Sequence, residues 1–353
     1  MSFGGLLLGR VSKEIGIDLG TANTLVYVKD RGIVINEPSV VAINNRTDQI
    51  VAVGHEAQRM IGKTPPHITV TRPLVDGIIS DYEVTEKMLR YFIDKVHAEN
   101  FTLLNRPRVI VCIPTEVTEV ERKAVEDAVL ATGARSVQLV EEPMAAAVGI
   151  RMAVQEPTAS MIVDLGGGTT EIAVISLGGI VAKRSLKLAG DEFNRSIIQF
   201  GREEFNLLVG ERAAELIKIK IGSAAPLDDP METTMRGRDL VSGLPKEVVV
   251  TDSQIRKALS RGVRTIVENV RAMLEETPPE LVADIYERGI VLTGGGALLR
   301  NLDRVIADMA QVPVRIADDP LTAVVRGTGI LLESEELLAE VALPAAQDMP
   351  FAK

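Results

Sequence analysis

The sequence predicts an α/β protein with two related lobes, each built on a mixed β-sheet flanked by helices. Two glycine-rich hairpin patterns support this prediction. In each of them an apolar strand runs into Asp-Leu-Gly and a few small or hydroxyl residues, and a second apolar strand follows. Because the pattern occurs at Asp18 and again at Asp164, 146 residues apart, we expect two halves of common design.

The segment 161–176 is typical of a strand, a tight turn and a second strand. Gly166, Gly167 and Gly168 carry no Cβ, so backbone N–H groups in the turn can approach an anion, and Thr169 adds a hydroxyl donor. These features suit a phosphate-binding loop. No Gly-Lys-Ser/Thr follows, which excludes a Walker P-loop. Alone, the segment is more typical of an ordinary hairpin, and the second copy reverses that preference.

The second copy, residues 14–28, places Gly20, Thr21, Ala22 and Asn23 after the strand that ends near Asp18. Each half would offer one hairpin to the phosphates of a nucleotide. A third element, residues 289–299, is an apolar strand that runs into glycines and then a helix. This pattern suits close backbone approach to a flat base or a ribose. Its central residues are Gly294, Gly295, Gly296, Ala297 and Leu298.

The length and composition of the chain limit the classes of protein to which it can belong. A chain of 353 residues can form two domains or one bilobed unit. The net charge of −10 argues against a non-specific nucleic-acid binder, so we expect no nucleic-acid partner. No apolar run is long enough to span a bilayer, and no signal-peptide pattern is present. The single cysteine, Cys112, lies in an apolar strand and fits a small buried residue in a reducing cytoplasm.

The first residues have a helical apolar pattern. Phe3, Leu6, Leu7 and Val11 are spaced to share one helix face, with basic residues nearby, as in a segment that lies in a membrane interface. Three glycines oppose a helix, since each costs about 1 kcal/mol relative to alanine. From these residues alone, residues 1–13 are equally compatible with a membrane anchor and a frayed terminus.

The rest of the first half alternates strands and helices. Short strands are expected within 32–43 and 49–53, and a helix begins at about residue 81. The loop 99–106 then carries Phe101, Leu103 and Leu104. Large apolar residues on a loop can mark an insertion surface, although packing under the neighbouring helix explains them equally well.

A buried strand at 108–113 precedes a helix that Thr118 and Glu121 open with a capping box and that ends near residue 133. The next strand, 136–140, delivers Glu141 and Glu142 to the carboxyl end of a sheet, where open α/β sheets bind ligands. Pro143 then starts an alanine-rich helix. A carboxylate here could orient a water towards a terminal phosphate, or both acids could simply be exposed.

The second half begins at about residue 150. After its hairpin we expect a strand at 179–188, a helix from 191 to about 208, and a helix at 211–221. The last places Glu215 and Lys218 on one face, a spacing that also suits a solvated ion pair. A β-rich stretch (232–251), helices at 253–275 and 278–287, the segment 312–316 and a final helix starting within 319–329 complete the chain.

The two hairpins, Glu141-Glu-Pro-Met-Ala-Ala-Ala147 and Leu292-Thr-Gly-Gly-Gly-Ala-Leu298 resemble the two phosphate motifs, the connecting motif and the adenosine motif of the actin, sugar kinase and heat-shock chaperone ATPases. Within this superfamily the chain is most similar, nearly end to end, to the MreB family of bacterial actins. The resemblance implies an actin-like, RNase H-like ATPase fold with the nucleotide in the cleft between the lobes.

The resemblance also implies roles for residues. Glu142, helped by Thr169, would be catalytic, and Asp18 and Asp164 would hold Mg²⁺ through water. Helix 211–221 would supply a purine and ribose wall, although the family usually has a charged residue where this chain has Leu216 or Ile219. The implied nucleotide-binding residues are Asp18, Gly20, Thr21, Ala22, Asn23, Asp164, Gly166, Gly167, Gly168, Thr169, Glu215, Leu216, Ile217, Lys218, Gly294, Gly295, Gly296, Ala297 and Leu298.

The same resemblance predicts four subdomains after a membrane segment at residues 1–13. The first large subdomain (IA) comprises residues 14–37, 72–149 and 325–353, and the small subdomain inserted in it (IB) comprises 38–71. The second large subdomain (IIA) comprises 150–188 and 248–324, and its insertion (IIB) comprises 189–247.

The function implied is that of an ATPase that binds ATP or ADP with Mg²⁺ and polymerises with itself, in paired filaments, on the inner face of the cytoplasmic membrane. There it would organise cell-wall elongation and shape proteins, with slow ATP hydrolysis coupled to filament turnover. Membrane contact is expected from Phe3, Leu6, Leu7, Phe101, Leu103 and Leu104. The alternatives are a sugar or acetate kinase, a chaperone-like ATPase, and a membrane scaffold that hardly hydrolyses its nucleotide.

Overall fold

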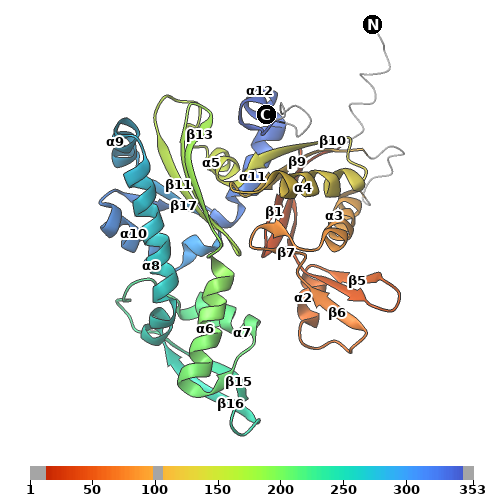
Figure 1. Cartoon of the computed structure of the whole chain (residues 1–353), viewed down its shortest axis with the longest axis vertical. Coiled ribbons are helices and arrows are strands. Elements are labelled where there is room, and N and C mark those ends of the chain that lie inside the picture. The colour runs from red at the N-terminus through yellow and green to blue at the C-terminus, as the bar shows by residue number, and fades with distance from the viewer. Residues whose placement is uncertain (1–12, 98–105, 345–353) are drawn as a thin grey trace. The chain divides into compact units, whose positions relative to one another are not determined.

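A computed structural model describes residues 13–97 and 106–344. The chain divides into two compact units. Unit 1 comprises residues 1–155 and 322–353, and unit 2 comprises residues 156–321. Unit 1 is therefore discontinuous in sequence, and unit 2 is one continuous stretch (Figure 1).

Unit 1 is built on a five-stranded mixed sheet with the strand order β10-β9-β1-β2-β3. β1 (Glu14–Leu19) pairs antiparallel with β2 (Asn23–Val28), and β2 pairs antiparallel with β3 (Gly32–Pro38). On the other side, β1 pairs parallel with β9 (Arg108–Ile113), which pairs parallel with β10 (Ser136–Glu141). The predicted hairpin 14–28 is therefore β1–β2.

The five-stranded sheet of unit 2 has the strand order β13-β12-β11-β17-β18. β11 (Ser160–Leu165) pairs antiparallel with β12 (Thr170–Ser176), which pairs antiparallel with β13 (Gly179–Leu186). β11 also pairs parallel with β17 (Ile290–Thr293), and β17 pairs parallel with β18 (Val314–Ile316).

The two sheets have the same topology. In each, a hairpin and a third antiparallel strand lie on one side, and two parallel strands that follow later in the chain lie on the other. The repeated Asp-Leu-Gly hairpin is thus part of a repeated sheet. This confirms the prediction of two related α/β halves.

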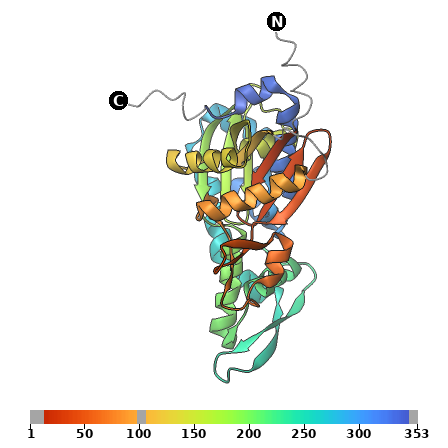
Figure 2. The same cartoon turned by 90° about the vertical axis from the view of Figure 1, so that its right-hand side faces the viewer.

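Helices cover both faces of the unit 1 sheet. α3 (Tyr82–His97) and α4 (Glu119–Ala131) share a core cluster with Ile15 and Ile17 of β1, and Figure 2 shows them (orange and yellow) side by side. Between these two isoleucines, Gly16 packs against Thr328 of α11 (Ala323–Glu333). Because neighbouring strand residues point to opposite faces, α11 covers the other face. α5 (Glu142–Gly149) packs against α11.

A small three-stranded sheet, with the order β5-β4-β6, follows β3 in unit 1. Its strands are β4 (Val41–Asn44), β5 (Gln49–Val53) and β6 (Ile68–Thr71), and α2 (His55–Met60) packs against them. Lys87 of α3 pairs with Asp48 in the β4–β5 turn at 2.7 Å. A two-stranded hairpin, β7 (Leu74–Val75) and β8 (Ile78–Ile79), leads from the small sheet to α3.

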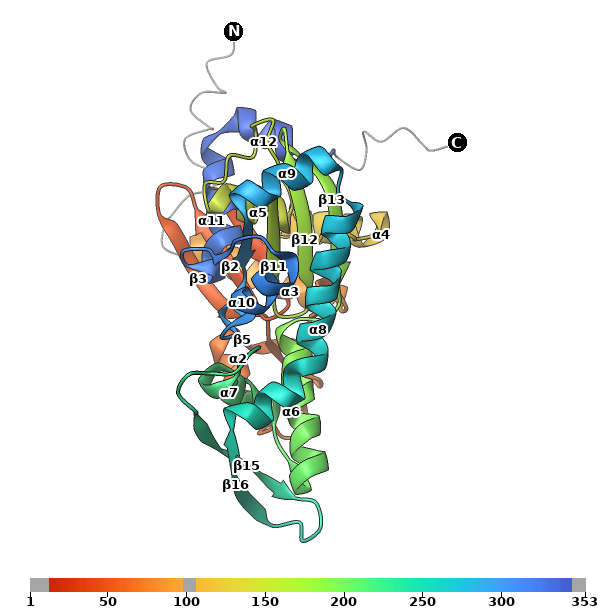
Figure 3. The same ribbon diagram turned by 90° about the vertical axis from the view of Figure 1, so that its left-hand side faces the viewer.

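In unit 2, α8 (Asp252–Glu276), α9 (Pro279–Arg288) and α10 (Leu302–Ala310) pack against the main sheet, as Figure 3 shows. α6 (Gly190–Phe205) and α7 (Glu211–Ile221) pack together beside a small sheet of order β14-β15-β16. Its strands are β14 (Leu207–Leu208), β15 (Glu232–Asp239) and β16 (Pro245–Thr251). The 3₁₀ helices η1 (Gly295–Leu298) and η2 (Pro320–Thr322) complete the unit.

Two predictions about helices were wrong. α6 ends at Phe205 and not near residue 208, because Asn206 takes the left-handed conformation (φ 51°) and residues 207–208 form β14. Asparagine tolerates that conformation at a helix end. α11 is also not the last helix. Ser334 caps a further helix, α12 (Glu335–Val341), by accepting a hydrogen bond from the N–H of Leu337.

We predict that Gly327→Ala destabilises unit 1. A Cβ at this position would collide with the carbonyl oxygen of Ala145 in α5, and a backbone atom cannot easily move away. Overpacking of this kind costs about 3 kcal/mol, which exceeds the roughly 1 kcal/mol that alanine gains over glycine in a helix. Urea denaturation followed by circular dichroism measures the difference.

Gly210→Ala is the matched control. A Cβ at Gly210 would have no atom of the described structure within 4 Å of it, and the φ of −79° suits any residue. A free energy of unfolding for Gly327→Ala equal to that of Gly210→Ala would show that α5 and α11 can separate without cost.

Candidate nucleotide site

The first phosphate hairpin is held in shape by its neighbours in unit 1. Asp18 lies opposite Leu25 near the end of β1, and the turn follows at Gly20. A Cβ on Gly20 would lie 2.7 Å from the carbonyl oxygen of Asn23, so the turn requires glycine. Ser39 donates its hydroxyl to the Gly20 carbonyl at 2.6 Å and its N–H to the Ala22 carbonyl at 3.0 Å. These two hydrogen bonds from Ser39 fix the backbone of the turn.

Thr21, in the middle of this turn, is buried. Its hydroxyl oxygen accepts a hydrogen bond from the N–H of Gly77 at 2.8 Å. Gly77 belongs to the β7–β8 turn, where Asp76 and Gly77 both have positive φ (49° and 80°). This is the conformation of a two-residue hairpin turn. The β7–β8 hairpin thus holds the side chain of a predicted phosphate ligand.

The second phosphate hairpin has the corresponding arrangement in unit 2. Asp164 lies opposite Glu171, and the N–H of Gly166 donates to the Thr169 carbonyl across the turn at 2.8 Å. The first residues of α6 then hold the turn: the N–H of Gly190 donates to the Gly166 carbonyl at 3.2 Å and that of Asp191 to the Gly167 carbonyl at 2.8 Å. The N-terminal end of α6 therefore fixes the glycine loop.

Asp164 is a deeply buried carboxylate, only 5% exposed. Thr293, at the end of β17, donates its hydroxyl to Asp164 Oδ1 at 2.8 Å. Burial raises the pKa of Asp164 to about 6, with a further rise from the nearby charge of Glu171, while the Thr293 hydrogen bond opposes the shift. Thr293 was absent from the predicted site residues. Its place directly before the three glycines was the sequence signal, whereas its pairing opposite Asp164 is seen only in the sheet.

The glycine segment 294–296 packs directly against the second hairpin. A Cβ on Gly294, whose φ is 77°, would collide with the Leu165 carbonyl and lie 2.9 Å from Asp164 Oδ1. A Cβ on Gly296 would lie 2.8 Å from the Leu165 Cβ. Only glycine permits this approach. Ala297 is buried, whereas Leu298 is 52% exposed.

α7 brings Lys218 to the same place. Its ammonium donates to the Gly190 carbonyl at 2.8 Å, directly behind the turn of the second hairpin, and burial lowers its pKa. Leu216 is largely exposed. Ile217 is different, because its side chain packs in the hydrophobic core of unit 2. The side chain of Ile217 therefore faces the core, and its place in a purine wall stays a prediction that only its backbone could meet.

Glu142 lies at the carboxyl edge of the unit 1 sheet. Across that edge Asp18, Cys112 and Val140 are in register on β1, β9 and β10, so Asp18 and the end of β10 share one edge. Glu142 is the first residue of α5, directly after β10, and is buried. Its neighbour Glu141 ends β10 and is half-buried.

The structure thus assembles the predicted residues into two half-sites. In unit 1, the first hairpin and Glu142 lie at one sheet edge. In unit 2, the second hairpin, Lys218 and the glycine segment pack together. Within residues 13–97 and 106–344, no group of three or more acidic, histidine or cysteine side chains could hold a metal ion. The second hairpin offers the buried Asp164 carboxylate, whose pKa is raised. Mg²⁺ prefers oxygen ligands and keeps several of its waters, so a single carboxylate fits Mg²⁺ held through water.

The predicted membrane residues, Phe3, Leu6, Leu7, Phe101, Leu103 and Leu104, lie outside the described residues. The chain that leads to both segments is described. Lys13 Nζ donates to the carbonyl of Val96, in the last turn of α3, at 2.6 Å. Residues 1–12 and 98–105 therefore join the fold at neighbouring points. Of the helices in the described part of the chain, none has the length and apolarity needed to cross a membrane.

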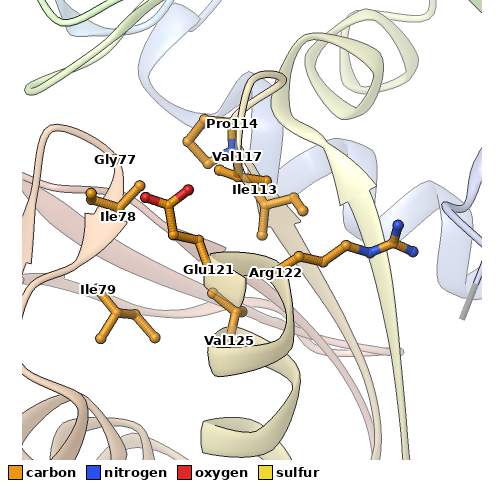
Figure 4. A pocket seen from close by; sticks show the side chains of 9 residues that line it. All are labelled: Gly77, Ile78, Ile79, Ile113, Pro114, Val117, Glu121, Arg122 and Val125. Atoms are coloured by element: carbon orange, nitrogen blue, oxygen red, sulfur yellow. The ribbon is translucent and has the colours of Figure 1, made fainter. Parts of the chain in front are cut away.

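A small apolar pocket lies between the β7–β8 hairpin and α4, lined by Gly77, Ile78, Ile79, Ile113, Pro114, Val117, Glu121, Arg122 and Val125. Figure 4 shows the Glu121 carboxylate directed towards Gly77 and the Arg122 guanidinium directed away from the pocket. None of the predicted nucleotide-binding residues lines it. The pocket is therefore separate from the half-site of unit 1, although Gly77 contacts Thr21.

Two units of matching topology, each carrying a glycine hairpin after its first strand, define an actin-like fold. The fold agrees with that of MreB5 of Spiroplasma citri bound to ADP, with a TM-score of 0.87 and 40% identity over 91% of this chain and 96% of that chain. It also agrees with the MamK double helical filament, with a TM-score of 0.77 and 22% identity over 92% of this chain and 99% of that chain.

The sequence comparisons give the family. The family model described as MreB/Mbl protein matches residues 12–340. The chain is 51% identical over 329 residues to the cell shape-determining protein MreB of Escherichia coli (strain K12), covering 92% of this chain and 94% of that protein. It is 48% identical over 332 residues to the cell shape-determining protein Mbl of Bacillus cereus, covering 94% and 99%. The chain belongs to the MreB/Mbl family.

We predict that Asp164 makes the metal-free protein less stable as the pH rises. The pKa of Asp164 is about 6 in the folded chain, above the value of about 3.9 expected when unfolded. Between these values the folded state binds more protons, so the free energy of unfolding falls as the pH rises through this window, by up to about 3 kcal/mol.

Urea denaturation in EDTA at pH 5 and pH 7 tests this. Asp164→Asn cannot titrate, so the variant should gain stability relative to the wild type at the higher pH. An identical pH dependence in the two proteins would show that Asp164 ionises as an ordinary exposed aspartate does.

Proposed function

We propose that this chain is an ATP-dependent filament protein that works on the inner face of the cytoplasmic membrane and helps to organise cell-wall elongation. The observation that carries the proposal is the pair of Asp-Leu-Gly hairpins in two sheets of identical topology, in a chain of the MreB/Mbl family. The relatives named as cell shape-determining proteins support the shape role.

ATP is the proposed ligand because both half-sites suit phosphates and a nucleoside. Structures of the similar MreB5 of Spiroplasma citri contain ADP and AMPPNP. In this chain the turns at Thr21–Asn23 and Gly166–Thr169 would donate backbone and hydroxyl hydrogen bonds to the phosphates. The glycine segment 294–296 and the Glu215–Lys218 face of α7 would contact the ribose and purine.

Hydrolysis would depend on positioning. Glu142, buried at the start of α5, would orient the attacking water, and the Thr169 hydroxyl would help to hold it. Mg²⁺, held through water by Asp18 and Asp164, would offset negative charge on the phosphate oxygens. The buried Asp164 carboxylate supports this role, because a bound cation favours the ionised form that burial disfavours.

Assembly follows from the family. The proposed polymer is a homopolymer in paired filaments, in which head-to-tail contacts extend without closing. Nucleotide that binds one arrangement of the units better than another would shift the population towards the assembling form. The MamK structure, which shares this fold and is described as a double helical filament, supports the proposal of self-association.

Membrane contact is proposed through residues 1–12 and the 99–106 loop. The hydrogen bond between Lys13 and the end of α3 supports their joint action, because it ties together the points from which both segments leave the fold. Two weak anchors acting together hold a protein that either one alone releases.

High-speed sedimentation of the purified chain tests the proposal, with and without ATP and Mg²⁺ and with and without vesicles that contain anionic lipid. We expect nucleotide-dependent pelleting that vesicles increase. Deletion of residues 1–11 should weaken the vesicle effect and leave the nucleotide effect. A chain that stays in the supernatant under every condition while it releases phosphate contradicts the filament, and a screen for small phosphate acceptors would then test the kinase alternative.

We predict that Glu142→Gln lowers the rate of ATP hydrolysis roughly 100-fold, within the range expected for loss of a general base, while the affinity for ATP changes little. Loss of the carboxylate removes the group that orients the water and none that holds the phosphates. Single-turnover phosphate release and nucleotide titration measure the two quantities.

Glu141→Gln is the matched control, since it removes the same charge one residue earlier. Equal rates for wild type and Glu142→Gln would refute the catalytic assignment. If hydrolysis is very slow in all three proteins while ATP binds tightly, the chain is a nucleotide-binding scaffold in which Glu142 has a structural role.

A further inference from the structure

Arg300 joins two parts of unit 2 that the proposed function places on either side of a nucleoside. It follows the glycine segment and η1 in the chain. Its Nη1 donates to the Ile219 carbonyl, in the last turn of α7, at 3.0 Å and to the Gly222 carbonyl at 3.4 Å. The guanidinium thus reaches from the glycine segment to the end of the helix that carries Glu215 and Lys218.

The surrounding backbone is built to bring these parts together. Residues 223 and 300 form a parallel β-bridge, and the N–H of Ala224 donates to the Arg300 carbonyl at 2.8 Å. Asn301 donates its side-chain N–H to the Pro226 carbonyl at 2.9 Å. The segment that leaves α7 therefore runs along residues 299–301 and is held at three successive points.

Gly222 makes the close contact possible. It ends α7, with its N–H donating to the Lys218 carbonyl at 2.8 Å. A Cβ at this position would collide with that carbonyl and lie 3.2 Å from the Leu299 side chain. Leu299 belongs to the same hydrophobic core cluster as Ile217 and Ile221 of α7. The apolar packing of Leu299 and the hydrogen bonds of Arg300 therefore act on the same turn at the end of α7.

The chemistry of the contact favours arginine. The last carbonyls of a helix have no partner within the helix and carry partial negative charge, so a cation there satisfies both needs. The guanidinium is permanently charged, and its Nη1 donates to both the Ile219 and the Gly222 carbonyl. Arg300 consequently fixes the turn of α7 that contains Lys218.

We infer that Arg300 is a positioning residue for the nucleoside: it sets the distance between the Glu215–Lys218 face of α7 and the glycine segment 294–296. This inference rests on the proposed function, because it assumes that both surfaces contact the nucleotide. The role inferred for Arg300 acts through its contacts with the end of α7. A displacement of one wall by a fraction of an ångström weakens contacts that both walls make at the same time.

Arg300→Met tests the inference, with binding of ATP and ADP measured by displacement of a fluorescent ADP analogue. We expect both affinities to fall by the same factor, roughly 10-fold, because the base and ribose are common to the two ligands and α7 is no longer held. Arg300→Lys should lie between Arg300→Met and the wild type, since one hydrogen bond to Ile219 can be kept.

Arg304→Met is the matched control, because Arg304 is an exposed arginine on α10, four residues further along the chain. The melting temperature of each nucleotide-free variant provides the second measurement. If Arg300→Met has the same melting temperature as the Arg304→Met control and binds both nucleotides as the control does, Arg300 does not position the site. If it melts far lower and the folded fraction binds normally, Arg300 only stabilises α7, and the inference is equally refuted.

The outcome for the wild type separates this inference from the proposed function. A wild-type chain that binds neither ATP nor ADP contradicts the proposed function itself and removes the basis of the inference. A wild-type chain that binds both, with no loss in Arg300→Met, contradicts the inference alone.

Discussion

Both units depend on backbone segments that approach one another more closely than a side chain would allow. In unit 1, glycine lets α11 contact β1 at residue 16 and lets α5 and α11 cross at residues 149 and 327. In unit 2, it lets the segment after β17 pack against the end of β11 at residues 294 and 296. A nucleotide site benefits from such contacts, because backbone segments without a Cβ can approach phosphate oxygens and a nucleoside closely. The same property of glycine thus serves packing in unit 1 and candidate binding in unit 2.

Much of this architecture could be predicted from the sequence, because local signals agreed with the fold. The capping box of Thr118 and Glu121 forms as expected, with Glu121 accepting from the Thr118 N–H at 2.7 Å. The alternation of apolar residues in both Asp-Leu-Gly hairpins also gave the correct strands. The end of α6 could not be predicted, since Asn206 stops the helix through its own backbone conformation while the apolar pattern continues through Leu208. The division into four subdomains stays a prediction.

The candidate site was predictable to the extent that glycines and acids mark it. What the sequence could not supply was the set of groups that hold those residues. Thr293 reaches Asp164 because β11 and β17 are neighbours, and Ser39 reaches Gly20 because β3 returns alongside β2. The burial of Ile217 could not be predicted for the same reason, since a helical pattern gives a face but not which neighbour covers it. These contacts join residues far apart in sequence, and only the sheet order reveals them.

The discontinuity of unit 1 has a consequence for how the chain folds as it is synthesised. Unit 2 is one uninterrupted stretch, so all the residues of its sheet and helices are available before the chain is finished. Unit 1 must wait, because α11, which covers one face of its sheet, follows the whole of unit 2 in the chain. Until then the β1 face at Gly16 has no helix against it, and an exposed apolar sheet is the kind of surface that recruits chaperones or aggregates. A long sequence separation between elements that contact each other, such as β1 and α11, also slows folding. The arrangement that packs α11 so tightly in the finished protein therefore leaves unit 1 vulnerable for most of its synthesis.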